Sequence, residues 1–407
     1  MDQRASDRVA DLTVEFEEDV VKLLLDAMRA AMRQERTDLG TESVLSALVS
    51  GDSAAGAAIA PGVKVSGSLA GSIGSRGTSV WVSEDAGDGR PESLDDRQEI
   101  DALWREVRHD EADRIRWKNR KKEERDRASL DLPPMTGAVR SVLHKALESA
   151  REEGVLSVCV GHVARALIEL PGTRAQEAML VEKLDTSAAA TALEALRGSD
   201  EVPEPATVLV LRKAGTFGKS GNPLTRKMTA WIFGGGAGFG SAVVGVVSSE
   251  ATRGAVRRGQ PQRRPVDLLM GILALERSLT VAERDLPEKL QGANRGAELL
   301  RRHGGGQEAM ARVLLPATGV VDVEPAEDRE PADFERRLLH VTQLTAAHHG
   351  SPTVGTTHLL AALLDETGTD AESAAEITRV LTESGVDVEA LRAEPELRVP
   401  RGAASPH

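Results

Sequence analysis

Apolar residues recur along much of the chain every three or four positions, which is the spacing of amphipathic helices. Residues 19–35 show this most clearly, with one face formed by Val20, Leu23, Leu24, Ala27, Met28 and Ala31. Charged residues occupy the opposite face, so this stretch predicts a helix that buries one side. Similar patterns recur along the chain and predict an all-α protein.

Two stretches near residue 100 have a different character. Residues 61–90 are rich in Gly and Ser and include a short alternating run, which predicts a loop or small hairpin. Residues 93–127 predict one long charged helix, with Ser93 as its candidate cap. Together they form a segment, residues 61–134, that interrupts the helical pattern of the chain.

One short phrase occurs near each end of the sequence. Residues 39–48 read Leu-Gly-Thr-Glu-Ser-Val-Leu-Ser-Ala-Leu, and residues 354–363 read Val-Gly-Thr-Thr-His-Leu-Leu-Ala-Ala-Leu. In both, the Gly-Thr pair ends a loop, the Thr is placed to cap the next helix, and an apolar run follows at helical spacing. The recurrence of a helix–loop–helix unit predicts internal repeats.

Two weaker copies of this unit lie between them, at residues 136–167 and 241–272. The place of the loop glycine is held in turn by Gly40, Cys159, Arg264 and Gly355. The expected start of the preceding helix lies 23 positions earlier each time, at Glu17, Thr136, Ser241 and Ala332. A third helix rich in small residues is expected to follow from Gly51, Gly172, Gly306 and Thr369.

At these residues the chain resembles the N-terminal repeat domain of Clp-type AAA+ unfoldases, in which two such helical repeats form one small domain. The resemblance covers about two thirds of the chain, over residues 14–60, 135–196, 239–316 and 333–395. It implies two tandem domains, 1–200 and 206–407, each a pseudo-twofold pair of helical repeats, with 61–134 inserted in the first. Residues 197–206 are polar, contain two prolines and are expected to link them.

Members of this family use the domain to dock substrates, adaptors and, in actinobacterial relatives, peptide antibiotics. No AAA+ module follows here, so the resemblance implies a stand-alone, non-enzymatic binding module without a cofactor. Its expected partners are protein or peptide ligands, including components or adaptors of a Clp protease system.

The resemblance also implies where such a ligand binds. The helix starts of paired repeats are expected to form a groove with free N–H groups at its floor. The predicted ligand-binding residues are Thr41, Glu42, Thr136, His162, Thr356, Thr357 and His358. Repeat three has Arg264-Pro265 at this place, a basic and stiff edge, so an acidic, apolar or cyclic peptide is expected to prefer the second domain.

Some family members read phosphorylated arginine through a Thr at the first helix start together with the Glu of Gly-Thr-Glu. The first repeat has Glu42 but Glu17 in the place of that Thr, and the second has Thr136 but Gly161 in the place of that Glu. No repeat holds both residues, so this mode of binding is not expected. The histidines of the Gly-Thr-Glu-His phrase, His162 and His358, are expected to serve helix packing and loop hydrogen bonding.

Composition narrows the function classes. Aromatic residues make up only 2% of the chain and Tyr is absent, so Ala, Leu and Val must fill the cores. A net charge of −13 argues against nucleic-acid binding by the chain as a whole. Cys159 is the single cysteine and is expected to be buried and inert. No apolar targeting segment or convincing membrane span is visible, so a cytoplasmic protein is expected.

Two alternative functions remain open at this point. The basic end of helix 93–127, with Trp117 inside it, could bind a partner protein or nucleic acid, or be a solvated helix face. The run 207–211 followed by Gly218-Lys219-Ser220 looks like a strand leading into a phosphate-binding loop, which would make the chain an NTP-binding enzyme. The first glycine of that loop is replaced by Lys213. The glycines at 234–240 are expected to form a flexible connection. The histidines near His358 are expected to serve packing.

Overall fold

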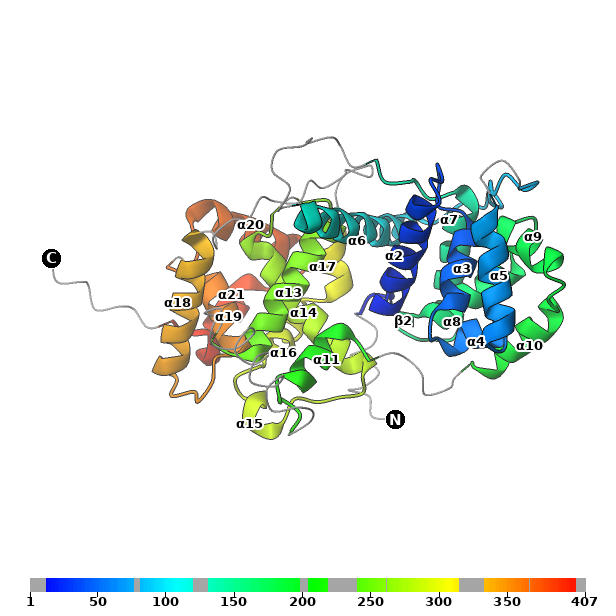
Figure 1. Ribbon diagram of the computed structural model, residues 1–407. Coiled ribbons are helices and arrows are strands. Elements are labelled where there is room, and N and C mark those ends of the chain that lie inside the picture. The colour runs from blue at the N-terminus through cyan, green and yellow to red at the C-terminus, as the bar shows by residue number, and fades with distance from the viewer. Residues whose placement is uncertain are drawn as a thin grey trace. The chain divides into compact units, whose positions relative to one another are not determined.

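The computed structural model describes residues 12–76, 81–119, 131–197, 204–218, 240–260, 262–314, 333–365 and 367–399 (Figure 1). These residues are predominantly helical, as predicted, and the described part contains a single two-stranded sheet. The chain forms two compact units. The first unit is Val14–Pro203, and the second comprises Met1–Thr13 and Glu204–His407.

The first unit contains two short strands among its helices. In chain order its elements are β1 (Glu15–Phe16), α2 (Glu18–Arg33), α3 (Thr41–Ser50), α4 (Ala54–Ile59), α5 (Val63–Ser75), α6 (Leu94–Asn119), α7 (Gly137–Glu152), β2 (Ser157–Val158), α8 (Val160–Glu169), α9 (Arg174–Val181) and α10 (Thr186–Ala195). Helix α2 packs on α3, and α7 packs on α8, which gives two helical pairs.

All the named elements among the described residues of the second unit are helices. Its elements are α11 (Ala206–Lys213), α13 (Ala242–Arg257), α14 (Pro265–Val281), α15 (Glu288–Gln291), α16 (Gly296–Arg302), α17 (Gln307–Leu314), α18 (Asp333–His348), α19 (Thr356–Leu364), α20 (Ala371–Glu383), α21 (Val388–Ala393) and the short 3-10 helix η3 (Pro395–Leu397). Helix α13 packs on α14, and α18 packs on α19.

The helix starts that the 23-residue offset predicts are confirmed wherever they are described. Glu17, Thr136 and Ser241 are the N-caps of α2, α7 and α13. The four loop positions are the N-caps of the second helices α3, α8, α14 and α19, namely Gly40, Cys159, Arg264 and Gly355. Thr136 and Ser241 cap through their hydroxyls, which accept the N–H groups of Val139 and Val244.

The two repeats of the first unit are joined by reciprocal strand pairing. Strand β1, which precedes α2, pairs in parallel with β2, which precedes α8. Leu39, which precedes α3, forms a parallel bridge with Met135, which precedes α7. In both contacts, the segment before the first helix of one repeat pairs with the segment before the second helix of the other repeat.

The second unit shows one half of the same arrangement. Gly240 precedes the first helix of its first repeat, and Val354 precedes the second helix of its second repeat. These two residues lie together so closely that a Cβ on Gly240 would come within 2.9 Å of Val354 Cγ2. The residue matching Met135 in the second unit, directly before position 332, lies outside the described residues.

In both units, the third helix of each repeat packs on the second helix of the other repeat. In the first unit α4 packs on α8 and α9 packs on α3, while in the second α16 packs on α19 and α20 packs on α14. Helix α16 therefore takes the place of α4, as the third helix of the first repeat in its unit. The sequence had assigned this place to the helix after Gly306, which is α17, and that alignment is wrong by one helix.

Two local predictions are also wrong. Residues 63–75 form helix α5 instead of a loop or hairpin, because Leu69 and Ile73 lie one turn apart and are buried. The expected strand at 207–211 is part of helix α11, so a phosphate-binding loop lacks the strand that should lead into it. Lys219, Ser220 and the glycines at 234–239 lie outside the described residues.

The long charged helix is confirmed as α6, with Ser93 Oγ accepting the N–H of Asp96 at 3.1 Å. Residues 120–127 of the predicted helix lie outside the described part. In each unit the core consists almost wholly of Leu, Val, Ile, Ala and Met. The predicted buried face of α2 lies in the first of these cores, with Val20, Leu24, Ala27, Met28 and Ala31 fully buried. No helix in the described residues is both long enough and apolar enough to span a membrane.

Candidate functional site

The predicted ligand-binding residues are mostly buried. Thr41, Glu42, His162, Thr356, Thr357 and His358 are buried, and Thr136 is half-buried. Thr41 and Thr136 come together in the first unit, while Thr356, Thr357 and His358 share the first turn of α19 in the second. His162 lies in the first turn of α8, in the other helical pair of the first unit.

One carboxylate from the inserted segment joins Thr41 and Thr136. Asp85 is only 2% exposed, and its Oδ2 accepts hydrogen bonds from the Thr41 N–H (2.7 Å) and the Thr136 hydroxyl (2.8 Å). Its Oδ1 accepts from the Thr41 hydroxyl (2.7 Å) and the Arg174 N–H (3.0 Å). Asp85 therefore accepts hydrogen bonds at the N-termini of α3, α7 and α9 and holds them together. The field of the helix N-termini favours a negative charge at this place.

The second helices of the other three repeats, α8, α14 and α19, do not depend on Asp85 at their N-termini. The first N–H of α8, on Val160, donates to Asp19 Oδ2 at 2.9 Å, and that of α19, on Thr356, donates to Asn294 Oδ1 at 2.9 Å. In α14 the first residue is Pro265, which has no N–H to offer. The free N–H groups predicted at these helix starts are thus absent from the first position of all four helices, and that prediction is wrong.

The Thr of each Gly-Thr pair was predicted to cap the helix that follows, but its role in the structure is different. Thr41 and Thr356 are the first residues of their helices, and the N-caps are Gly40 and Gly355. Each hydroxyl instead accepts an N–H from the third helix of the other repeat. Ala175 of α9 donates to Thr41 at 3.0 Å, and Gly296 of α16 donates to Thr356 at 3.1 Å.

Glu42 is held in a buried ion pair. Its carboxylate is fully buried, accepts a hydrogen bond from Arg36 and lies 3.8 Å from Arg174 Nη1. Burial raises the pKa of the Glu42 carboxyl, while Arg36 and Arg174 oppose that shift. Since Arg36 also donates to the carbonyl of Ile73 at 2.8 Å, the pair ties α5 to the start of α3. In the structure Glu42 forms an ion pair with the buried Arg36, inside the first unit.

His162 and His358 do serve loop hydrogen bonding. His162 Nδ1 accepts the N–H of Cys159, and His358 Nδ1 accepts the N–H of Gly355, both at 3.1 Å. Asp267 does the same in the third repeat, where its Oδ2 accepts the N–H of Arg264 at 2.7 Å. Burial, together with the neighbouring His349, lowers the pKa of His358 to about 4, so this imidazole is neutral near pH 7.

Cys159 lies beside His162, with Sγ 3.2 Å from Nδ1. The residue is half-buried, where full burial was predicted. Desolvation and the neighbouring carboxylate of Asp19 raise the pKa of the thiol. The thiolate that nucleophilic chemistry needs is therefore disfavoured at this position.

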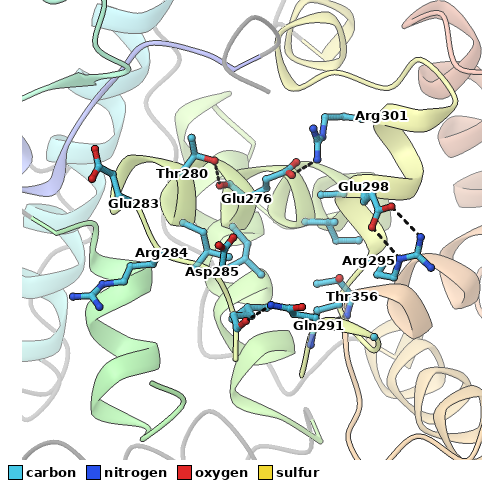
Figure 2. Close-up of a pocket in the computed structure, with 17 residues that line it drawn as sticks. Glu276, Thr280, Glu283, Arg284, Asp285, Gln291, Arg295, Glu298, Arg301 and Thr356 are labelled. Carbon is cyan, nitrogen blue, oxygen red and sulfur yellow. Dashed lines mark hydrogen bonds and ion pairs between the residues drawn. The ribbon is translucent and has the colours of Figure 1, made fainter. Parts of the chain in front are cut away.

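The second unit contains a cavity of about 670 Å³ beside the start of α19 (Figure 2). Helix α14 forms one wall, α16 forms another, and the connection 282–294 with the short helix α15 borders it. Its apolar lining consists of Ile272, Leu275, Leu279, Leu286 and Ala297. Thr356 is the one predicted ligand residue on this lining.

Charged side chains border the same cavity, and several are paired. Arg301 forms an ion pair with Glu276, and Arg295 Nε lies 2.9 Å from Glu298 Oε2 (Figure 2). Hydrogen bonding to Arg295 lowers the pKa of the Glu298 carboxyl to about 2. Glu298 is therefore ionised near pH 7, and both acids are paired with arginines.

No sequence pattern indicates this cavity, because it lies between the repeated phrases. The connection 282–294 is mainly polar, and only scattered apolar residues such as the buried Leu286 and the half-buried Leu290 pack on the helices. Asp85 is not among the predicted site residues and lies in the segment predicted as a loop or hairpin. Its partners are 44, 51 and 89 residues away, so no local pattern connects them.

Among the described residues, no group of three or more His, Cys, Asp or Glu side chains is placed to hold a metal ion. The two sites differ in character: the first unit has a closed junction around Asp85, and the second has an apolar cavity with charged borders. Comparisons of the chain with protein-family models, curated proteins and solved structures found no match.

Proposed function

We propose that this chain is a non-enzymatic binding module of the Clp N-terminal type, which docks protein or peptide ligands of a Clp protease system. Three features support the resemblance on which the proposal rests. The helix pairs start at a constant offset, the repeats of the first unit exchange their entry segments, and His162 and His358 bond back to the loop before their helices.

The cavity in the second unit is the observation that carries the docking function. It is bordered by α14, α16 and the start of α19, and its volume lies within the roughly 300–1,000 Å³ common for ligand sites. Its floor is apolar, and its border carries polar groups that can orient a ligand. At the starts of α3, α7 and α9 in the first unit, Asp85 already accepts the hydrogen bonds that a ligand would otherwise accept.

A peptide bound here would insert apolar side chains between α14 and α16. Such burial is the main source of affinity when a peptide enters a groove between helices. Leu275 and Ala297 are buried on this wall, so contact with them removes apolar surface of the ligand from water. The site is thus suited to an apolar segment of a partner protein.

The test is a binding titration of the full chain with labelled peptides that share the same apolar residues. Filling the cavity by Ala297→Met should weaken binding by about tenfold, which corresponds to about 1.4 kcal/mol. Ala190→Met is the matched control, because Ala190 is exposed on α10 of the first unit. Fluorescence anisotropy measures the affinities, and circular dichroism confirms that both variants are folded.

A second candidate function rests on Trp117. This side chain is 73% exposed near the end of α6, between the basic residues Arg116 and Lys118. An exposed aromatic flanked by cations can stack on a base or contact an acidic partner. Binding that survives Ala297→Met and is lost in Trp117→Ala would assign the function to α6 and reject the cavity as the docking site.

A further inference from the structure

We propose that the cavity selects peptides in which an apolar side chain is followed by a lysine or arginine. This inference rests on the proposed docking function and names the class of ligand. The expectation from sequence was an acidic, apolar or cyclic peptide, because of Arg264-Pro265, and the proposal keeps the apolar contact but replaces the acidic group with a basic one. Arg264 is not on the lining of the cavity and is paired with Glu376 at 2.7 Å.

The apolar part of the ligand follows from the floor. Ile272, Leu275, Leu286 and Ala297 are buried and present only hydrocarbon to the cavity. A charged side chain placed against them would lose its hydration without gaining a hydrogen bond, which is unfavourable. A Leu, Met or Phe side chain would instead gain from the same contact.

Two of the three arginines on the cavity lining are already paired with carboxylates. Arg301 is bound by Glu276, and Arg295 is bound by both Glu298 and Glu396. An acidic peptide would have to compete with these carboxylates, which are already held in place. Removing one partner of such a half-buried pair leaves the other uncompensated.

The border of the cavity does hold acids that are not matched in this way. Among the described residues, neither Asp285 nor Glu283 makes an ion pair, and both are exposed. Figure 2 shows Asp285 directed toward the middle of the cavity and Glu283 directed away from it. Arg284 also points outward in this view, and its Nε lies 3.9 Å from Glu204. Asp285 is thus the charged group that a bound ligand meets next to the apolar floor.

A ligand cation beside Asp285 would gain an ion pair at the edge of a low-dielectric site. Exposed pairs of this kind contribute up to about 1 kcal/mol, or about fivefold in affinity. The effect should be larger at low ionic strength, because salt screens an exposed pair. Charge then selects the ligand, while the apolar contact provides most of its affinity.

The experiment uses the full chain and three labelled peptides with identical apolar residues and a basic, neutral or acidic neighbouring residue. We expect the basic peptide to bind most tightly and the acidic one least tightly. Asp285→Asn should lower the affinity for the basic peptide about fivefold and leave the affinity for the neutral peptide unchanged. Glu288→Gln is the control, since Glu288 is exposed three residues away and is not on the cavity lining.

The outcomes separate the two proposals. If Ala297→Met weakens every peptide but the acidic peptide binds as well as the basic one, the docking site stands and the charge preference is wrong. The preference is also wrong if Asp285→Asn leaves the basic peptide unaffected. If no peptide responds to Ala297→Met, the proposed docking function itself fails.

Discussion

At the scale of single residues, buried or half-buried polar side chains accept the first N–H groups of several helices in this protein. Asp85, Asp19 and Asn294 each accept the first N–H of a helix that belongs to a different part of the chain. Such a bond removes an unsatisfied donor and fixes the position of one segment against another. These residues therefore link local capping to the packing of whole repeats.

Asp85→Asn should destabilise the first unit by about 2–4 kcal/mol. The substitution keeps a residue that tolerates the positive φ of 58° but removes the charge and one acceptor from a buried cluster of four donors. Urea unfolding followed by tryptophan fluorescence measures the change. Asp88→Asn is the control, because Asp88 is exposed in the same segment and should cost less than about 0.5 kcal/mol. Equal effects of the two substitutions would contradict the role given to Asp85.

His358 should make the second unit sensitive to acid. Its folded-state pKa of about 4 is below the ordinary value of 6.5, so the unfolded chain takes up the proton first as the pH falls. The contribution of His358 to stability is complete above pH 6.5 and falls by about 1.4 kcal/mol per pH unit between 6.5 and 4. Hydrogen exchange of the α19 amides at a series of pH values measures this loss.

His358→Gln is the variant that isolates this effect. A Gln at the third position of a helix can still bond back to the N-cap N–H, as His358 does to Gly355. The variant should keep the protection of α19 at pH 7 and show a smaller loss between pH 6.5 and 4. An unchanged pH dependence would mean that another group controls the acid response.

At the scale of the elements, the sequence predicted the helix pairs because their apolar faces recur at a fixed offset. It failed for α5, where Gly67, Gly71 and Gly74 lower the intrinsic helix propensity and burial of Leu69 and Ile73 outweighs it. It failed for α11 because a run of four apolar residues at 208–211 suits a strand or a helix equally. The junction at Asp85 depends on contacts between distant segments, so no single element could reveal it.

The buried face of α2 gives a direct test of how the helices are held. Leu24→Asp places a charge at a fully buried position, which should cost about 3–5 kcal/mol and unfold the first unit. Lys22→Asp is the control on the same helix, because Lys22 is exposed and should change the stability little. Thermal unfolding by circular dichroism compares the two. A melting curve of Leu24→Asp that matches the control would mean that α2 does not pack through this face.

At the scale of the whole molecule, each unit is completed only by segments that are far apart in the chain. In the first unit Glu15 pairs with Ser157 and Leu39 with Met135, and the inserted helices α5 and α6 lie between these partners in sequence. Lengthening such a loop has only a small entropic cost, since the cost grows with the logarithm of the length. The insert is therefore compatible with a stable unit even though it separates the two repeats.

The same pairing has a consequence for synthesis on the ribosome. The partner of Glu15 is made 142 residues later, which takes on the order of ten seconds at about 5–20 residues per second. During that interval the apolar sides of α2 and α3 have no second repeat to cover them, and they are open to chaperones and to other nascent chains. The insert, at little cost to the finished protein, lengthens the time during which its first half depends on protection by others.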